Sequence, residues 1–235
     1  MNINKFIEEN EIIKDSVISI IGMGGKTTLL LYLGNELSKE YKTLIGTTTK
    51  LGNKKYVENE YNSLDAINKK NPPNLALLYE HKNDKKIWGP ELNVWENTRK
   101  VFEILVLEAD GSMSKPLKAW RDDEPVFLES TTHSICIFPL WGLGKKIDEE
   151  NVLRLELFRD HYSDKIIDIE LVNEILSGNN TPFKHKNSKH ILLLNAADKI
   201  EKEELNRIRK YYQESEVKYS VYLTSILENY YEKIK

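Results

Sequence analysis

An apolar strand, a glycine-rich turn and a helix follow one another near the start of the chain, and this order constrains the fold most. Residues 17–21 (VISII) form a short β-branched run, typical of a strand that is covered on both faces. The turn spans Gly22–Gly25, and residues 26–39 (KTTLLLYLGNELSK) place leucines at helical spacing. A buried strand that leads into a helix is typical of a β-α-β unit, which favours a parallel sheet.

Apolar runs and helical patterns alternate along the rest of the chain. The other predicted strands are residues 43–47, 75–79, 104–107, 134–138, 190–194 and 217–223, the last strand of the chain. The other predicted helices are residues 148–159, 169–176, 201–213 and an amphipathic C-terminal helix in SILENYYEKIK. This alternation predicts an α/β fold, a three-layer αβα sandwich around a mostly parallel sheet. We expect one domain over residues 1–235, because the polar loop 177–189 is followed by another helix and strand.

Composition and charge exclude several classes of protein. The chain has 34 Lys+Arg and 37 Asp+Glu, a net charge of −3 that gives no overall attraction for nucleic acid. No apolar stretch approaches the roughly 18 residues of a membrane span, and the acidic N-terminus does not resemble a secretory signal. The lone Cys136 is expected to be buried and inert, with a role as a selenium or sulfur carrier as the alternative, and the histidines lack metal-binding spacing. We expect a cytoplasmic protein without nucleic-acid or membrane partners.

The glycine turn has the sequence of a phosphate-binding loop. Its glycines let successive N–H groups face an anion, and the helix N-terminus adds partial positive charge. We expect Lys26 to extend from an exposed loop position to the β- and γ-phosphates, and the Thr27 hydroxyl to bind Mg²⁺. The spacing is the short G-x-x-G-K-T, because Ile20 stands where the longer motif has its first glycine. The alternative is an ordinary glycine turn with a solvated lysine. The predicted nucleotide-binding residues are Gly22, Met23, Gly24, Gly25, Lys26, Thr27 and Thr28.

Polar residues follow two further predicted strands. Open α/β sheets bind ligands at the carboxyl ends of their strands, where Thr49 could meet Mg²⁺ or the γ-phosphate and Lys50 an anionic substrate. The alternative is a strand end with a solvated lysine. Residues 104–107 lead into Glu108 and Asp110, which are predicted to hold Mg²⁺ or to orient a water, in an order that the sequence leaves open. The alternative there is a turn at Asp110.

A candidate for base recognition follows the predicted strand 190–194. In GTPases an N-K-x-D motif occupies this position; its Asp accepts hydrogen bonds from guanine and its Asn braces the loop. Asn195 and Asp198 keep this spacing, but Ala196 replaces the lysine whose stem would cover the ring. The alternative is that Asp198 caps a helix that starts near Ile200. With ATP and GTP both open, we expect a slight preference for GTP.

Five segments, in order, resemble the YqeC family of selenium-dependent hydroxylase accessory proteins: VISIIGMGGKTTLL, TTTK, LEADGSMSKPLKAW with DDEPV, LRLELF and LLLNAADK. The resemblance spans residues 17–198, and the part EADGS…KPLKA…EP is the most specific. It implies a P-loop NTPase-like version of the predicted sandwich. It also picks out residues for a substrate or partner: Ser112, Lys115, Lys118, Glu124 and Arg154. From chemistry alone, a solvated loop is the alternative for both lysines.

The resemblance also implies a function. The chain would bind Mg²⁺ and ATP or GTP, hydrolyse it, and help selenium-dependent molybdenum hydroxylases to mature by acting on a labile selenium-containing cofactor. The expected partners are therefore a nucleotide and such a hydroxylase or another maturation protein. Two alternatives from other classes stay open: a nucleotide-dependent scaffold without significant turnover, and a ligase- or kinase-like phosphotransferase, which the short phosphate loop suggests.

Overall fold

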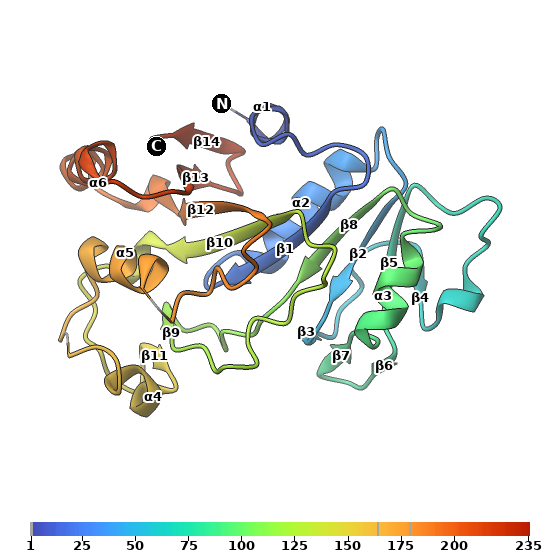
Figure 1. Cartoon of the computed structure of the whole chain (residues 1–235), viewed down its shortest axis with the longest axis horizontal. Coiled ribbons are helices and arrows are strands. Elements are labelled where there is room, and N and C mark those ends of the chain that lie inside the picture. The colour runs from blue at the N-terminus through green and yellow to red at the C-terminus, as the bar shows by residue number, and fades with distance from the viewer. Residues whose placement is uncertain (1, 164, 179) are drawn as a thin grey trace.

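The apolar runs of the sequence form the centre of one nine-stranded sheet (Figure 1). The computed structural model describes residues 2–163, 165–178 and 180–235. Across the sheet the strands are β14 (Tyr230–Lys233), β13 (Ser220–Ser225), β12 (Lys189–Asn195), β10 (His133–Pro139), β1 (Val17–Gly22), β8 (Ile104–Glu108), β2 (Thr43–Thr47), β5 (Leu75–Leu78) and β4 (Glu60–Tyr61). Among the described residues, only the β13–β14 pairing of this sheet is antiparallel. The prediction of an α/β fold with a mostly parallel sheet is therefore confirmed.

Helices cover both faces of the sheet. The helices are α1 (Ile3–Glu9), α2 (Lys26–Leu37), α3 (Leu92–Thr98), α4 (Leu155–Arg159), α5 (Ile169–Ser177) and α6 (Lys202–Glu214). Alternate residues of β1 point to opposite faces, so that Ile18 and Ile20 pack in one cluster with α1 and α2. Ile21 lies in the cluster of the other face, with α5 and α6. None of the helices in the described ranges is long and apolar enough to cross a membrane.

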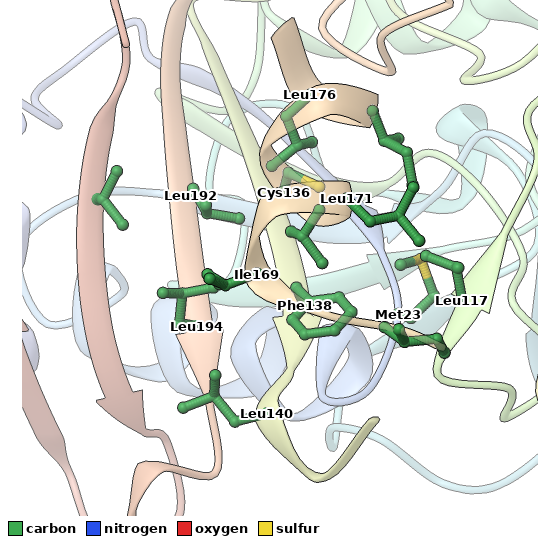
Figure 2. Close-up of a cluster of buried hydrophobic side chains, with 14 of the residues drawn as sticks. Met23, Leu117, Cys136, Phe138, Leu140, Ile169, Leu171, Leu176, Leu192 and Leu194 are labelled. Carbon is green, nitrogen blue, oxygen red and sulfur yellow. The ribbon is translucent and has the colours of Figure 1, made fainter. Parts of the chain in front are cut away.

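The larger of these clusters joins α5 to the middle of the sheet (Figure 2). Figure 2 shows Leu171 and Leu176 of α5 directed toward Cys136 and Phe138 of β10, with Leu192 on the neighbouring strand. Cys136 is 1% exposed, and burial raises the pKa of its thiol, as expected of an inert cysteine. This packing fixes β10 beside β1, which positions the loop that leaves β1.

The route of the chain marks one point at the carboxyl edge of the sheet. From β1 the chain passes through α2 to β2, which lies beyond β8, whereas from β8 it returns past β1 to β10. The connections therefore diverge around β1. In open α/β sheets the crevice for a ligand lies at such a switch point, outside the carboxyl ends of the strands.

Shorter elements surround this edge. One small sheet contains β3 (Lys50–Gly52), β7 (Lys86–Trp88) and β6 (His81–Lys82), and another pairs β9 (Leu117–Lys118) with β11 (Val152–Leu153). The 3-10 helices are η1 (Leu64–Ala66), η2 (Leu140–Gly142) and η3 (Ala197–Lys199). These elements, like α1, α3 and β4, are not predicted by the sequence pattern, because they are short and rest on tertiary contacts.

The prediction of one helix over residues 148–159 is wrong. The Asp148 carboxylate accepts hydrogen bonds from the backbone of Glu150 and Asn151, which forms a turn. β11 then pairs with β9, and Arg154 adopts a left-handed conformation with φ of 63°. Only α4, five residues long, is helical in this range. The apolar residues of this segment follow tertiary pairing rather than helical periodicity.

The prediction of a C-terminal helix is also wrong. The strand predicted over residues 217–223 is not the last strand of the chain, because β14 follows it. The chain turns after β13 and returns as β14, with Tyr231 opposite Thr224. Figure 1 shows β14 next to α1, and the Ile3 backbone donates to Asn229 Oδ1 at 2.9 Å. Tyr231 is fully buried in the cluster of α1 and α2. Tyr230 and Tyr231 therefore pack as neighbouring residues of a strand rather than along one side of a helix.

Candidate functional site

The turn after β1 is built so that its glycines are required. Gly22 and Gly24 have φ of 93° and 63°, which residues with a side chain rarely adopt. A Cβ on Gly22 would lie 2.3 Å from the carbonyl oxygen of Ile137, and one on Gly24 would lie 2.4 Å from Cβ of Pro139. The turn is thus pressed against β10 and leads directly into the first turn of α2. This is the context in which backbone N–H groups and a helix N-terminus bind an anion.

Lys26 is the first residue of α2, and it is 4% exposed rather than in the exposed loop position expected from the sequence. Its Nζ donates to the Gly22 carbonyl oxygen at 2.6 Å and lies 3.1 Å from Asp110 Oδ1 and 3.8 Å from Glu108 Oε1. Burial lowers the pKa of Lys26, but the two carboxylates outweigh it, so that the pKa is raised. The side chain is therefore charged and held against carboxylates beside the turn Gly22–Gly25, which is named the phosphate loop after its predicted ligand. The interpretation as a solvated lysine is wrong.

Thr27 and Glu108 face each other across the gap between α2 and β8. Glu108 ends β8, and its Oε2 accepts a hydrogen bond from Thr27 Oγ1 at 3.0 Å. Burial raises the pKa of Glu108, and Lys26 and the Thr27 hydroxyl offset only part of that shift. A hydroxyl and a carboxylate are oxygen ligands of the type that Mg²⁺ accepts, with phosphate oxygens and waters completing its shell. The pair therefore fits a magnesium ion that is shared with a bound phosphate. Within the described ranges, no group of three or more His, Cys, Asp or Glu side chains could hold a metal by itself.

Asp110 has a different environment from Glu108. It is fully buried, and its carboxylate accepts hydrogen bonds from Gly22 N at 3.1 Å, Lys118 Nζ at 3.0 Å and Trp120 Nε1 at 2.6 Å. Burial raises its pKa, but Lys26 and Lys118 outweigh burial, so that the pKa is lowered. Asp110 is thus ionised and occupied by donors from the phosphate loop and from the loop after β8. This arrangement fixes Gly22 rather than presenting free oxygens to a ligand.

A row of alternating charges runs from the phosphate loop toward the surface. Lys118 is fully buried and lies 3.2 Å from Glu124 Oε2, so the solvated-loop interpretation is wrong for this lysine. Arg154 in turn holds Glu124 with both arms of its guanidinium, NH1 to Oε2 at 2.8 Å and NH2 to Oε1 at 2.6 Å. The order Lys26–Asp110–Lys118–Glu124–Arg154 joins three of the five predicted segments in one contiguous network.

Other residues predicted to bind a substrate or partner lie outside this network. Lys115 donates to the backbone carbonyls of Glu149 and Val152, which anchors the turn before β11. Ser112 is half-buried, and its carbonyl accepts from the Lys115 backbone. Lys50 is exposed on β3, with Nζ 5.4 Å from the centre of the Trp88 ring. These three residues are not brought into direct contact with the phosphate loop.

The threonines after β2 are packed against the end of β8. Thr47 Oγ1 donates to the Glu108 carbonyl oxygen at 2.8 Å, and Thr49 Oγ1 lies 3.3 Å from Thr47 Oγ1. Thr48 donates to the carbonyl oxygen of Val126 at 2.7 Å. Thr49 is therefore connected to the end of β8 through Thr47, and it lies at the same edge of the sheet as the phosphate loop.

Asn195 connects the phosphate loop to the ends of β12 and β13. Its Nδ2 donates to the Gly24 carbonyl oxygen at 3.0 Å, and its Oδ1 accepts from the Ile226 backbone at 3.2 Å. Asp198 lies in η3, is exposed, and accepts from Ser225 Oγ at 2.5 Å. Since α6 begins only at Lys202 with Glu201 as its N-cap residue, the interpretation of Asp198 as a helix cap is wrong.

Two residues at the site were missed in the sequence. Trp120 ends the motif LEADGSMSKPLKAW without a predicted role, although a buried indole N–H needs a partner and finds it in Asp110. Ser225 holds Asp198. Its signal was its place at the carboxyl end of β13, the neighbour of β12, because neighbouring parallel strands end at one edge of the sheet.

Comparison with known proteins places the chain in a family. The family model described as YqeC protein matches residues 18–156. That range contains the phosphate loop and the whole charged network. Among curated proteins, the chain is 30% identical over 162 residues to "Uncharacterized protein YqeC" of Escherichia coli (strain K12). That alignment covers 63% of this chain and 60% of the relative, which is less than two thirds of the relative's length. No solved structure matches the chain. The family match extends over more than half of the described chain, and the chain belongs to the YqeC family.

Proposed function

We propose that the chain is a P-loop NTPase-like protein that binds a nucleoside triphosphate with Mg²⁺ at Gly22–Thr28. The observation that carries this proposal is the contact between Thr27 and Glu108, 3.0 Å apart, directly beside a glycine turn and a buried lysine. A phosphate loop alone is common, but a hydroxyl and a carboxylate placed together at its first helical turn support a shared metal ion.

Binding would exchange one anionic partner of Lys26 for another. Lys26 Nζ now contacts the Gly22 carbonyl and Asp110 Oδ1. A β,γ-phosphate seated in the turn would attract this ammonium and accept hydrogen bonds from the loop N–H groups. Asp110 would keep Lys118, Trp120 and the Gly22 N–H as partners, and so it would stay satisfied and hold the turn in shape.

Hydrolysis would use Glu108 rather than Asp110. When bound, Mg²⁺ would neutralise charge on the β- and γ-phosphates. Burial raises the pKa of Glu108, and its partners are the Thr27 hydroxyl at 3.0 Å and Lys26 Nζ at 3.8 Å. Glu108 is therefore the carboxylate that would hold the metal ion and orient an attacking water, since the oxygens of Asp110 already accept from Gly22, Lys118 and Trp120.

A second candidate is a nucleotide-dependent scaffold without significant turnover. The specific observation in its favour is the full occupation of Asp110, the second acid that the sequence offered for orienting a water. With one carboxylate left for both the metal and the water, slow hydrolysis is a natural consequence. The two candidates differ in turnover and not in the site of binding.

The biological role rests on the resemblance to the family alone. We propose that nucleotide binding in the cytoplasm serves the maturation of selenium-dependent molybdenum hydroxylases, by acting on or delivering a labile selenium-containing cofactor. The ion pairs of Lys118, Glu124 and Arg154 connect the phosphate loop to the surface. They support a link between nucleotide binding at the loop and contact with the selenium-containing cofactor or a partner protein at the surface.

Phosphate release separates the two candidates. The measurement uses the purified chain with Mg²⁺ and GTP or ATP, alone and with a candidate hydroxylase, and Glu108→Gln as the control. Release above that control, stimulated by the hydroxylase, supports an NTPase maturation factor. Tight nucleotide binding with release equal to Glu108→Gln supports the scaffold. Absence of nucleotide binding contradicts both.

A further inference from the structure

The loops after β12 and β13 are attached to the phosphate loop and to each other. Asn195 bridges the Gly24 carbonyl and the Ile226 backbone, and Ser225 holds Asp198. A Cβ on Gly25 would lie 3.4 Å from Ile226 Cδ1, so Ile226 packs directly on the turn. A nucleotide whose phosphates lie in the turn would therefore place its sugar and base over these two loops.

Leu227 follows immediately and is 71% exposed, unlike its neighbour Ile226, which is 2% exposed. Single exposed leucines are ordinary on protein surfaces, so the exposure by itself carries no argument. The position of Leu227 is informative because it continues the loop whose Ser225 contacts Asp198 and whose Ile226 contacts Asn195 and Gly25.

The backbone around Leu227 is held by three hydrogen bonds. Tyr32 of α2 donates its hydroxyl to the Leu227 carbonyl oxygen at 3.2 Å. The backbone N–H groups of Glu228 and Asn229 donate to the carbonyls of Ser225 and Ile226, each at 3.1 Å. The exposed side chain therefore projects from an ordered turn, which lowers the entropic cost of using it to contact a ligand.

We propose that Leu227 covers one face of the base of the bound nucleotide, while Asp198 meets the edge of that base. This inference rests on the proposed function, since the phosphates place the base. Ala196, with φ of 67°, offers only a methyl group where a lysine stem could have covered a ring. A planar base that removes Leu227 from water would replace that missing apolar surface. The ligand class is thus a nucleoside triphosphate, and not a polyphosphate or a phosphorylated sugar.

Two ligands isolate the contribution of the base: GTP, and ribose 5-triphosphate, which has the sugar and phosphates without a base. Their affinities for wild type, Leu227→Ala and Leu227→Lys are measured by calorimetry with Mg²⁺. Ile13→Ala is the matched control, an apolar residue that is 60% exposed before β1, at the opposite edge of the sheet.

Leu227→Ala should weaken GTP about fivefold and leave ribose 5-triphosphate within about twofold, because only the base loses apolar cover. Leu227→Lys keeps a long apolar stem, so its ratio of GTP to ribose 5-triphosphate affinity should stay within about twofold of wild type. Ile13→Ala should change neither affinity. An equal effect of Leu227→Ala on both ligands, or on neither, overturns the inference while the phosphate site stands. Failure of wild type to bind either ligand overturns the proposed function itself.

Discussion

Lys26 Nζ lies 3.1 Å from Asp110 Oδ1, and both side chains are almost wholly excluded from solvent. The lysine expected to meet phosphate is therefore paired with a carboxylate that also holds the Gly22 N–H. One interaction thus shapes the turn and positions the ammonium that a ligand would take over. Substitutions at Lys26, Glu108 and Asp110 separate the shaping of the turn from the binding of a ligand.

Lys26→Ala should weaken binding of a nucleoside triphosphate by more than tenfold, because it removes the ammonium nearest to the turn. It should also lower the free energy of unfolding of the ligand-free protein by about 3 kcal/mol, because Asp110 and Glu108 lose a buried counter-charge. Urea unfolding and calorimetry measure the two effects. Lys39→Ala, whose side chain is 66% exposed just beyond α2, is the control and should change neither. A stable Lys26→Ala variant that binds nucleotide normally would show that the turn does not bind phosphate.

Glu108→Gln should raise the Mg²⁺ concentration needed for nucleotide binding or turnover, because it removes the carboxylate beside Thr27. Its stability at neutral pH should be equal to or higher than that of wild type. The raised pKa of Glu108 means that the folded protein penalises its ionised form, and this penalty grows as pH rises from the unfolded pKa to the folded one. Magnesium titrations and unfolding curves test both statements. An unchanged Mg²⁺ requirement would remove Glu108 from the metal site.

Asp110→Asn should be destabilising, in contrast to Glu108→Gln, and its deficit should depend on pH. The lowered pKa of Asp110 means that its contribution is fully present above its unfolded pKa of about 3.9 and is lost as pH falls through the lower folded pKa. The difference in unfolding free energy between wild type and Asp110→Asn should therefore shrink below about pH 4. A difference that is the same at pH 3 and pH 7 would show that the charge of Asp110 is not what stabilises the turn.

Asp198→Asn should shift base preference from guanine toward xanthine, because a carboxylate acceptor becomes an amide that also donates. For wild type we expect GTP to bind modestly more tightly than ATP, by an amount on the order of 1–3 kcal/mol at most. Competition among GTP, ATP and XTP measures the ratios, with the exposed Asp65→Asn as control. Because Asp198 does not cap α6, the substitution should leave the melting temperature nearly unchanged. Wild type that prefers ATP, with ratios unaltered in Asp198→Asn, would exclude guanine recognition by this residue.

Much of the sheet was predictable, because strands buried on both faces carry continuous apolar runs. Residues 17–21 and 190–194 are such runs, and both are strands. The helix over 148–159 failed because Asp148, Arg154 and the pairing of β11 with β9 override the local pattern. The C-terminal strand was missed because the burial of Tyr231 depends on α1, which lies more than 200 residues away in the sequence.

The residues of the site were more predictable than their roles. Glycine spacing, Lys26, Thr27 and Glu108 are local features of a strand, a turn and a helix, and the structure brings them together. The sequence could not separate Glu108 from Asp110, because the difference lies in donors from distant segments, such as Trp120 and Lys118. The burial of Lys118 was likewise invisible, since it depends on Glu124 and on the Arg154 that follows β11.

The most direct test of the central claim is thermal unfolding of the wild-type chain with Mg²⁺ and GTP, ATP or their diphosphates. A ligand at about 100 times its dissociation constant should stabilise the fold by roughly 2.7 kcal/mol, and the melting temperature should rise accordingly. If the turn binds nucleotide, the melting temperature of wild type rises with at least one triphosphate, and the same ligand raises the melting temperature of Lys26→Ala by less. No rise with any nucleotide, at concentrations up to the millimolar range, would contradict it.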